Sequence, residues 1–181
     1  GFIIAGNYVG VGVDGTTALE SSGLGIALVS AGGVIGGDTS ADGNIISYNE
    51  TVGAVTGTST VLVKNNIVTH QTVEGWIVFG DSVDSPEVTF LENTMYDNTG
   101  LAINIGTDLN ADFTLAIGVS VNVNDLGDAD DGANGFLNHP VILKTEQDSN
   151  NIANLVVTYM LDVPSTGFPY YVEFYKNPSG L

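Results

Sequence analysis

The sequence contains no cysteine and no arginine, and its basic side chains are three lysines and two histidines. Without cysteine there is no disulfide framework and no thiolate chemistry. Lys64, Lys144 and Lys176 stand against 21 acidic residues, which gives a net charge of −18. A nucleic-acid backbone is bound by clustered lysines and arginines, so this composition argues against a nucleic-acid partner. Such a charge favours solubility and the binding of divalent cations.

Long apolar runs are also missing. No stretch of about 20 apolar residues predicts a membrane-spanning helix, and the first residues do not have the pattern of a signal peptide. The chain opens directly on the apolar segment GFIIAGN, so we expect a piece of a longer precursor whose signal sequence lies upstream. A cysteine-free acidic chain is compatible with export from a bacterium, and we expect an extracellular or cell-surface location.

Two patterns recur along the first 106 residues. In one, a few apolar residues precede an asparagine and another apolar residue follows it, at Asn7, Asn49, Asn66 and Asn93. In the other, alternating apolar residues follow a glycine, at Gly25, Gly53, Gly75 and Gly100, which are 28, 22 and 25 residues apart. A short strand, a tight turn, a second strand and a loop, repeated at this period, are typical of the coils of a parallel β-helix.

The chemistry of these residues fits stacked coils. Asparagine tolerates the left-handed backbone conformation of a sharp bend, and its amide can bond to the same position of the next coil to form a ladder. We therefore expect a structural ladder of Asn7, Asn49, Asn66 and Asn93. We also expect two inward columns, one of Ile4, Ile46, Val63 and Phe90 and one of Ile26, Val55, Ile77 and Ile103.

The alternative fold is an antiparallel β-sandwich, whose strands also alternate apolar and polar residues. Hairpin signals such as Asn-Gly between paired strands are scarce in this chain. The sequence therefore favours an all-β fold built on a parallel β-helix.

The phrases IIAGNYVGVGVDGTTAL and VIGGDTSADGNIISYNE resemble the repeats of secreted bacterial right-handed parallel β-helix proteins with the pectate-lyase-like fold. The resemblance covers residues 1–106 and also extends to the acidic stretch that ends in GFLNHPVIL. It implies β-helix coils over residues 1–121, an acidic junction over 122–139 and a small, sandwich-like β-rich module over 140–181. Strands are expected there at about 140–145, 153–162 and 170–176, fewer than a free-standing sandwich needs.

Catalytic motifs are not evident, and we assign no catalytic residue. A lyase of the pectate-lyase type needs cationic groups, which three dispersed lysines do not supply. A glycoside hydrolase needs two or three carboxylates within roughly 5 to 10 Å. The candidates are loop residues, Asp81, Asp84, Glu87, Asp108 and Asp112, and solvated loop carboxylates are the simpler interpretation. His70 and His139 have no nucleophile partner and are too few for a zinc site.

The stretch NVNDLGDADDGAN, residues 122–134, contains many oxygen-bearing side chains within a short segment. Calcium takes six to eight oxygen ligands from carboxylates, amides and main-chain carbonyls, and glycines let the backbone curl around the ion. The candidate ligands are Asn124, Asp125, Asp128, Asp130, Asp131 and Asn134. The spacing does not match a helix–loop–helix calcium hand, because Gly132 and His139 fall on ligand positions. A calcium clamp between the β-helix and the C-terminal module and a solvated linker both remain open.

The sequence is therefore expected to encode a structural or adhesive module of a bacterial surface or secreted protein. Exposed strand edges at the ends of a coil stack favour self-association, including filaments, and neighbouring coils of a larger parent protein would cover the same edges. The second hypothesis is a carbohydrate-active or carbohydrate-binding domain. An enzyme of this kind requires carboxylates of successive coils to meet beside an exposed aromatic residue.

Overall fold

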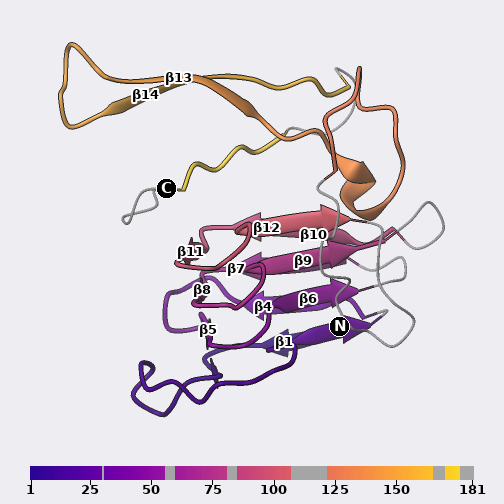
Figure 1. Ribbon diagram of the computed structural model, residues 1–181, viewed down its shortest axis with the longest axis vertical. Helices are drawn as coiled ribbons and strands as arrows, with labels where there is room; N and C mark the ends of the chain where they lie inside the picture. Colours follow the sequence, from indigo (N-terminus) through magenta and orange to yellow (C-terminus); the bar gives the residue numbers. More distant parts are fainter. Residues whose placement is uncertain (30, 56–59, 81–84, 107–121, 165–169, 176–181) are drawn as a thin grey trace.

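The computed structural model describes residues 1–29, 31–55, 60–80, 85–106, 122–164 and 170–175. The chain winds through three parallel sheets, and each sheet contains four strands, one from each successive coil. Figure 1 shows the strands of these coils stacked along the long axis of the molecule. The fold is therefore a parallel β-helix, as the glycine and asparagine repeats predicted.

Strands far apart in the sequence pair in register, as the repeats require. The first sheet contains β1 (Phe2–Ile4), β4 (Gly33–Gly36), β7 (Thr60–Lys64) and β10 (Glu87–Leu91). The second contains β2 (Tyr8–Val9), β5 (Ile45–Ser47), β8 (Ile67–Thr69) and β11 (Thr94–Tyr96). The third contains β3 (Ala27–Val29), β6 (Val52–Val55), β9 (Trp76–Phe79) and β12 (Ile103–Gly106). Every pairing within these sheets is parallel.

Apolar side chains of successive coils stack into the interior, because one coil cannot bury its own inward face. The register of the first sheet aligns Ile4, Ile35, Val63 and Phe90. The prediction that Ile46 stands in this column is wrong, because Ile46 lies in β5 and aligns with Val9 and Val68 in the second sheet. Residues 37–44 separate β4 from β5, and this longer connection obscured which apolar run continues β1.

The second predicted column is also shifted. Val52 pairs with Trp76, and Trp76 pairs with Ile103, so these three positions share one column. Ile77 pairs instead with Asn104, and Val55 pairs with Phe79. A shift of one residue moves a side chain to the other face of a strand, and the repeat period alone does not fix that register.

Two amide ladders run along two corners of the coil stack. In the first ladder, Asn7, Asn44, Asn66 and Asn93 are linked side chain to side chain, with N–O distances of 3.0, 2.8 and 3.0 Å. The prediction of Asn49 in this ladder is wrong, because Asn44 holds that position.

The second ladder holds Asn49 at the corner between the second and third sheets. The amide oxygen of Gln71 accepts the main-chain N–H of Asn49 at 3.0 Å, and that of Asn98 accepts the N–H of Gln71 at 3.1 Å. Both ladders share a local feature, in which the residue before most of the amides has a positive φ. These residues include Asn65 and Glu92 in the first ladder and Tyr48 and His70 in the second. The two corners are thus alike in sequence, which explains the misplacement of Asn49.

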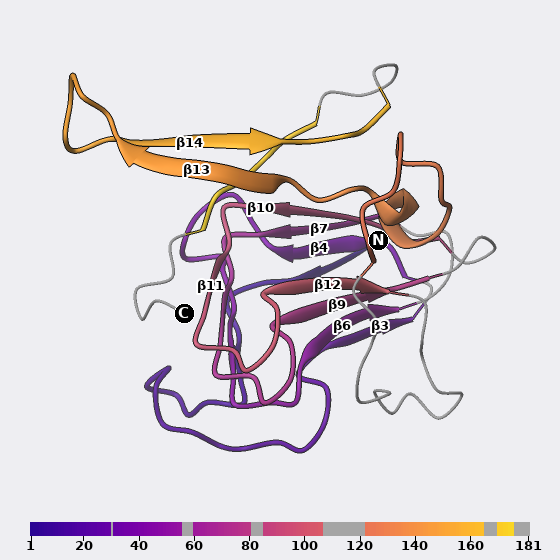
Figure 2. The ribbon, with the colours of Figure 1, turned by 45° about the horizontal axis from the view of Figure 1, so that its top comes forward.

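After β12 the chain closes one end of the stack and then leaves it. A short 3-10 segment, η1 (Ala133–Phe136), buries Ala133 and Phe136 against the hydrophobic core. The chain continues into an antiparallel hairpin of β13 (Val141–Gln147) and β14 (Leu155–Met160), which projects beyond the coils in Figures 1 and 2. The third predicted strand is wrong, since residues 170–175 form no strand. No helix of the described residues is long and apolar enough to cross a membrane.

Candidate metal site

The acidic junction is held against the last coil by the side chain of Asn134, which pairs with the strand edge as a further strand would. Asn134 pairs with the free edge of β10: its Oδ1 accepts the Val88 N–H at 2.6 Å, and its Nδ2 donates to the Val88 carbonyl at 2.9 Å. The Asn134 N–H donates to the Pro86 carbonyl at 2.9 Å. Predicted as a metal ligand, Asn134 instead closes the strand edge, where an unpaired peptide group would be costly.

Two further asparagines tie the junction to itself. The Asn124 amide pairs with the main chain of His139, accepting its N–H at 2.8 Å and donating to its carbonyl at 2.8 Å. The Asn138 amide pairs in the same way with the main chain of Asp125 at 2.9 and 2.8 Å, and it also donates to the Asp162 carbonyl at 2.7 Å. The amide oxygen of Asn124, a predicted ligand, thus already accepts one main-chain hydrogen bond.

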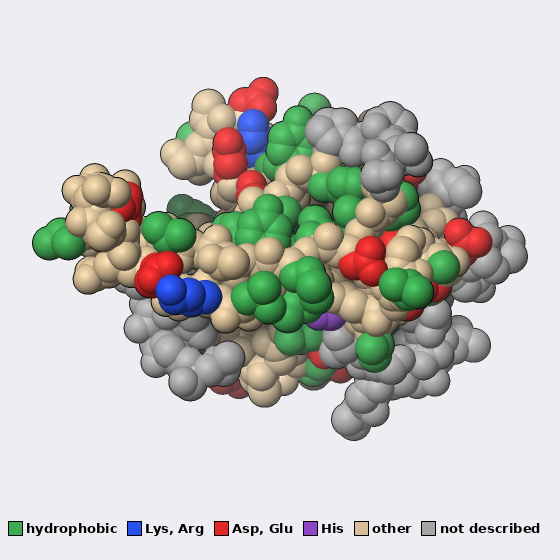
Figure 3. All heavy atoms as spheres, turned by 90° about the horizontal axis from the view of Figure 1, so that it is seen from above, with side chains coloured by type: hydrophobic (Ala, Val, Ile, Leu, Met, Phe, Trp, Pro, Cys, Tyr) green, Lys and Arg blue, Asp and Glu red, His purple; other side chains and the backbone are tan. Residues whose placement is uncertain are grey.

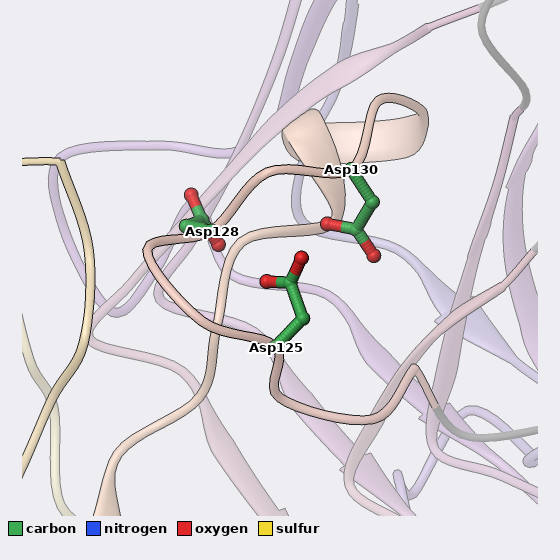
Figure 4. A group of neighbouring side chains, drawn as sticks. All are labelled: Asp125, Asp128 and Asp130. Carbon is green, nitrogen blue, oxygen red and sulfur yellow. The ribbon is translucent and has the colours of Figure 1, made fainter.

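Three of the four junction aspartates converge within this frame. Asp125, Asp128 and Asp130 each direct a carboxylate oxygen to one place, and these oxygens all lie within 4.8 Å of one another. Figure 4 shows the three side chains on one curled loop, pointing toward a shared space. Gly127 and Asp128 have left-handed backbone conformations, with φ of 74° and 56°, and these produce the curl. Such a group of oxygens could hold a metal ion.

The electrostatics of the cluster are those of crowded carboxylates. Burial raises the pKa of Asp128, and the charges of Asp130, Asp125 and Asp162 raise it further, while a hydrogen bond from the Asn138 N–H opposes the shift. That bond joins the Asn138 N–H to Asp128 Oδ1 at 2.6 Å. The Asp128 carboxyl therefore resists ionisation, and a bound cation would relieve the repulsion between its charge and those of its neighbours.

Individual oxygens differ in how they are satisfied. Both carboxylate oxygens of Asp125 accept the Ala129 N–H, at 3.2 and 3.0 Å. Asp130 Oδ1, in contrast, is buried and has no hydrogen-bond partner. A buried carboxylate oxygen without a donor is costly, and a cation is a suitable partner for it. The donor set consists of hard oxygen ligands, which suit divalent cations such as calcium, magnesium and manganese.

Two acidic residues behave differently from the sequence expectation. Asp131, a predicted ligand, is exposed and is not part of the convergent group. Asp162 was not predicted, yet its carboxylate accepts the Gly127 N–H at 3.1 Å and its charge acts on Asp128. Asp162 follows β14 and belongs to no recognisable sequence motif. Its place at the junction becomes visible only in the structure, where the chain returns to the junction after β14.

The remaining candidates of the sequence do not form a catalytic group in the described residues. Glu87 is exposed at the start of β10, and Asp81, Asp84, Asp108 and Asp112 lie outside the described residues. His70 stacks on Tyr48 with ring centroids 4.8 Å apart, and its Nδ1 lies 2.8 Å from the Thr69 hydroxyl. The His139 main chain is paired with Asn124, as described above. His70 thus contacts structural neighbours, whereas His139 is held through its main chain and is exposed.

Comparisons with known proteins add no relative to this description. No protein-family model, no curated protein sequence and no solved structure matches the chain. The geometry of the coils and of the junction is therefore the basis for the function proposed below.

Proposed function

We propose that this chain is a structural or adhesive module of a bacterial secreted or cell-surface protein, in which the β-helix is a stiff stalk. The observation that carries the proposal is the pair of continuous amide ladders. The buried amides of Asn44 and Asn66 bond to the coil on either side, so bending or opening one coil breaks bonds in its neighbours. The interior is filled by stacked apolar side chains such as Ile35, Val63 and Trp76, all fully buried.

The arrangement of acidic groups supports a structural role over catalysis. A hydrolase of this fold would gather carboxylates of successive coils on one face of the helix. Among the described residues, the one group of three or more acidic or histidine side chains close enough to hold a metal ion is Asp125, Asp128 and Asp130. These residues belong to one loop beyond the last coil, where they join two parts of the chain.

The proposal includes calcium as the ion of this cluster. Calcium would offset two of the three negative charges and fix the junction between the last coil and the hairpin. Ligand binding to the folded state alone contributes about 2.7 kcal/mol when the ligand is at 100 times its dissociation constant. For a chain of this size that corresponds to a rise of about 5 to 10 °C in the melting temperature.

Thermal unfolding tests the calcium clamp. We expect millimolar calcium to raise the melting temperature relative to chelator, and the double variant Asp128→Asn plus Asp130→Asn to abolish the rise. Asp131→Asn is the control, because it removes one neighbouring carboxylate from an exposed residue outside the cluster. An equal rise with magnesium would assign the site to divalent cations in general. A calcium response that survives in the double variant would overturn this assignment.

Carbohydrate binding is the second candidate, and one surface feature favours it. Tyr8 is 52% exposed and borders a cavity of about 200 Å³ that also touches Ile45, Asn65 and Ile67. An exposed ring beside amide groups suits stacking against a sugar. A glycan array would test this: binding that Tyr8→Ala abolishes would support it. Cleavage of a polysaccharide by the purified protein would contradict the structural role.

A further inference from the structure

The hairpin of β13 and β14 leaves apolar side chains exposed on both of its faces. Ile142, Leu143, Leu155 and Met160 are between 56% and 64% exposed. Figure 3 views the molecule from above and shows hydrophobic side chains gathered on the side that carries the hairpin. In the part of the chain that the structure describes, β13 and β14 pair only with each other. An isolated two-stranded ribbon is marginally stable in water, whereas three or more strands with an apolar face are stable.

The charge of the hairpin strands differs from that of the rest of the chain. The two strands, VILKTEQ and LVVTYM, contain one lysine and one glutamate and no other charged residue. Their net charge is therefore zero in a chain of net charge −18. Most surfaces of two copies would repel each other, but these strands can approach without that cost.

The positions of the two charges specify how a second copy would pair. Lys144 and Glu146 are two residues apart, and their side chains form an ion pair of 2.7 Å on one face of β13. Consider two β13 strands paired antiparallel about a two-fold axis at Thr145. Lys144 of each copy then stands opposite Glu146 of the other, and the four charges alternate in sign. Opposite charges directly across an antiparallel pair are favourable, and like charges are unfavourable.

The edge of β14 lacks these features. Its sequence LVVTYM has no charged residue to fix a register. Near its end, the Tyr159 ring already packs against Phe174, with centroids 5.5 Å apart. Residues 170–175 thus contact β14, while the described part of the chain places no such ring contact on β13.

We infer that β13 binds a second copy of this chain through antiparallel strand addition centred on Thr145, which forms a four-stranded sheet across the two-fold axis. The sheet would order as β14, β13, β13 and β14, and would join the apolar faces of the two hairpins. This partner goes beyond the proposed stalk function and does not require calcium at the junction.

Charge reversal tests the register. We expect sedimentation equilibrium to show a reversible dimer. Lys144→Glu should weaken it at least tenfold, because the new carboxylate would face Glu146 of the other copy on both sides of the axis. The double variant Lys144→Glu plus Glu146→Lys should restore the dissociation constant to within about threefold, since the opposite charges face each other again. Lys64→Glu is the control for the change in net charge, because Lys64 pairs with Asp38 on a coil.

Cysteine cross-linking tests the axis, and the absence of native cysteine keeps the result unambiguous. Thr145→Cys should form a disulfide-linked dimer under mild oxidation, because residue 145 faces its own copy. Thr158→Cys on β14 is the matched control and should remain monomeric. A monomer at all concentrations, equal weakening by Lys64→Glu, no rescue by the double variant, or preferential cross-linking through Thr158→Cys would overturn the inference. Circular dichroism of each variant separates loss of pairing from loss of folding.

Discussion

Truncation of Asn66 in the middle of the first ladder should destabilise the whole coil stack. The Oδ1 of Asn66 accepts the main-chain N–H of Asn44 at 3.1 Å and its side-chain amide at 2.8 Å. The Nδ2 of Asn66 donates to the carbonyls of Ile35 and Lys64 at 3.0 and 3.1 Å and to Asn93 Oδ1 at 3.0 Å. Asn66→Ala removes all five bonds at a site that is 1% exposed, where water cannot replace them.

The expected loss follows from the number of buried groups left without a partner. The Asn44 N–H loses its acceptor and the Ile35 carbonyl loses a donor, while the Lys64 carbonyl keeps the Gly37 N–H at 3.3 Å. At about 1 to 3 kcal/mol for each buried group left unsatisfied, the free energy of unfolding should fall by about 3 to 5 kcal/mol. This is a large part of the roughly 5 to 15 kcal/mol typical of a folded domain. Urea unfolding followed by circular dichroism measures it.

Asn7 at the exposed end of the same ladder supplies the control. Its amide donates to the Ala5 carbonyl at 2.9 Å and to Asn44 Oδ1 at 3.0 Å. After Asn7→Ala, that Oδ1 still accepts the main-chain N–H of residue 7, which lies at 3.0 Å. The cost should therefore be below about 1 kcal/mol. Equal losses for Asn7→Ala and Asn66→Ala would refute the view that burial within the ladder holds the coils together.

Two further predictions concern the junction and the corners. Folding raises the pKa of Asp128 above its ordinary value of 3.8, so the folded state binds that proton more tightly than the unfolded state does. The stability of chelator-treated protein should therefore fall as the pH rises above 3.8, until Asp128 is ionised in the folded state as well. Asp128→Asn should remove this part of the pH dependence of the urea midpoint, and an unchanged profile would contradict it. Gly36→Ala should cost several times more stability than Gly127→Ala. Both glycines have a positive φ, but a Cβ at Gly36 would lie 1.8 Å from the Lys64 carbonyl oxygen, whereas a Cβ at Gly127 would have no atom within 4 Å. Equal melting temperatures for the two variants would contradict a steric role for Gly36.

Much of the ladder design is readable from the sequence once both corners are recognised. An asparagine followed five positions later by another amide recurs at Asn44 and Asn49, at Asn66 and Gln71, and at Asn93 and Asn98. This spacing reflects a three-residue strand between two left-handed bends. A search for one asparagine per coil merges the two corners, which placed Asn49 in the wrong ladder.

The aspartate cluster of the junction was predictable in part. Asp125, Asp128 and Asp130 are close in the sequence, and the nearby glycine lets the loop curl, so local spacing was sufficient to propose them. The exclusion of Asp131 and the contribution of Asp162 were not predictable, because they depend on which way one exposed side chain points and on where the chain returns after β14.

The sequence by itself determined the class of fold. Residues that tolerate left-handed bends alternate with short apolar runs. Stacking of successive coils buries those runs, which a single coil would leave exposed. The tertiary structure decided the register of the strands and the contacts between distant segments. Which apolar run continues which column, which amide closes the edge of β10, and which surfaces of the hairpin stay open all depend on contacts between residues distant in the chain, and a repeat period carries no information about such contacts.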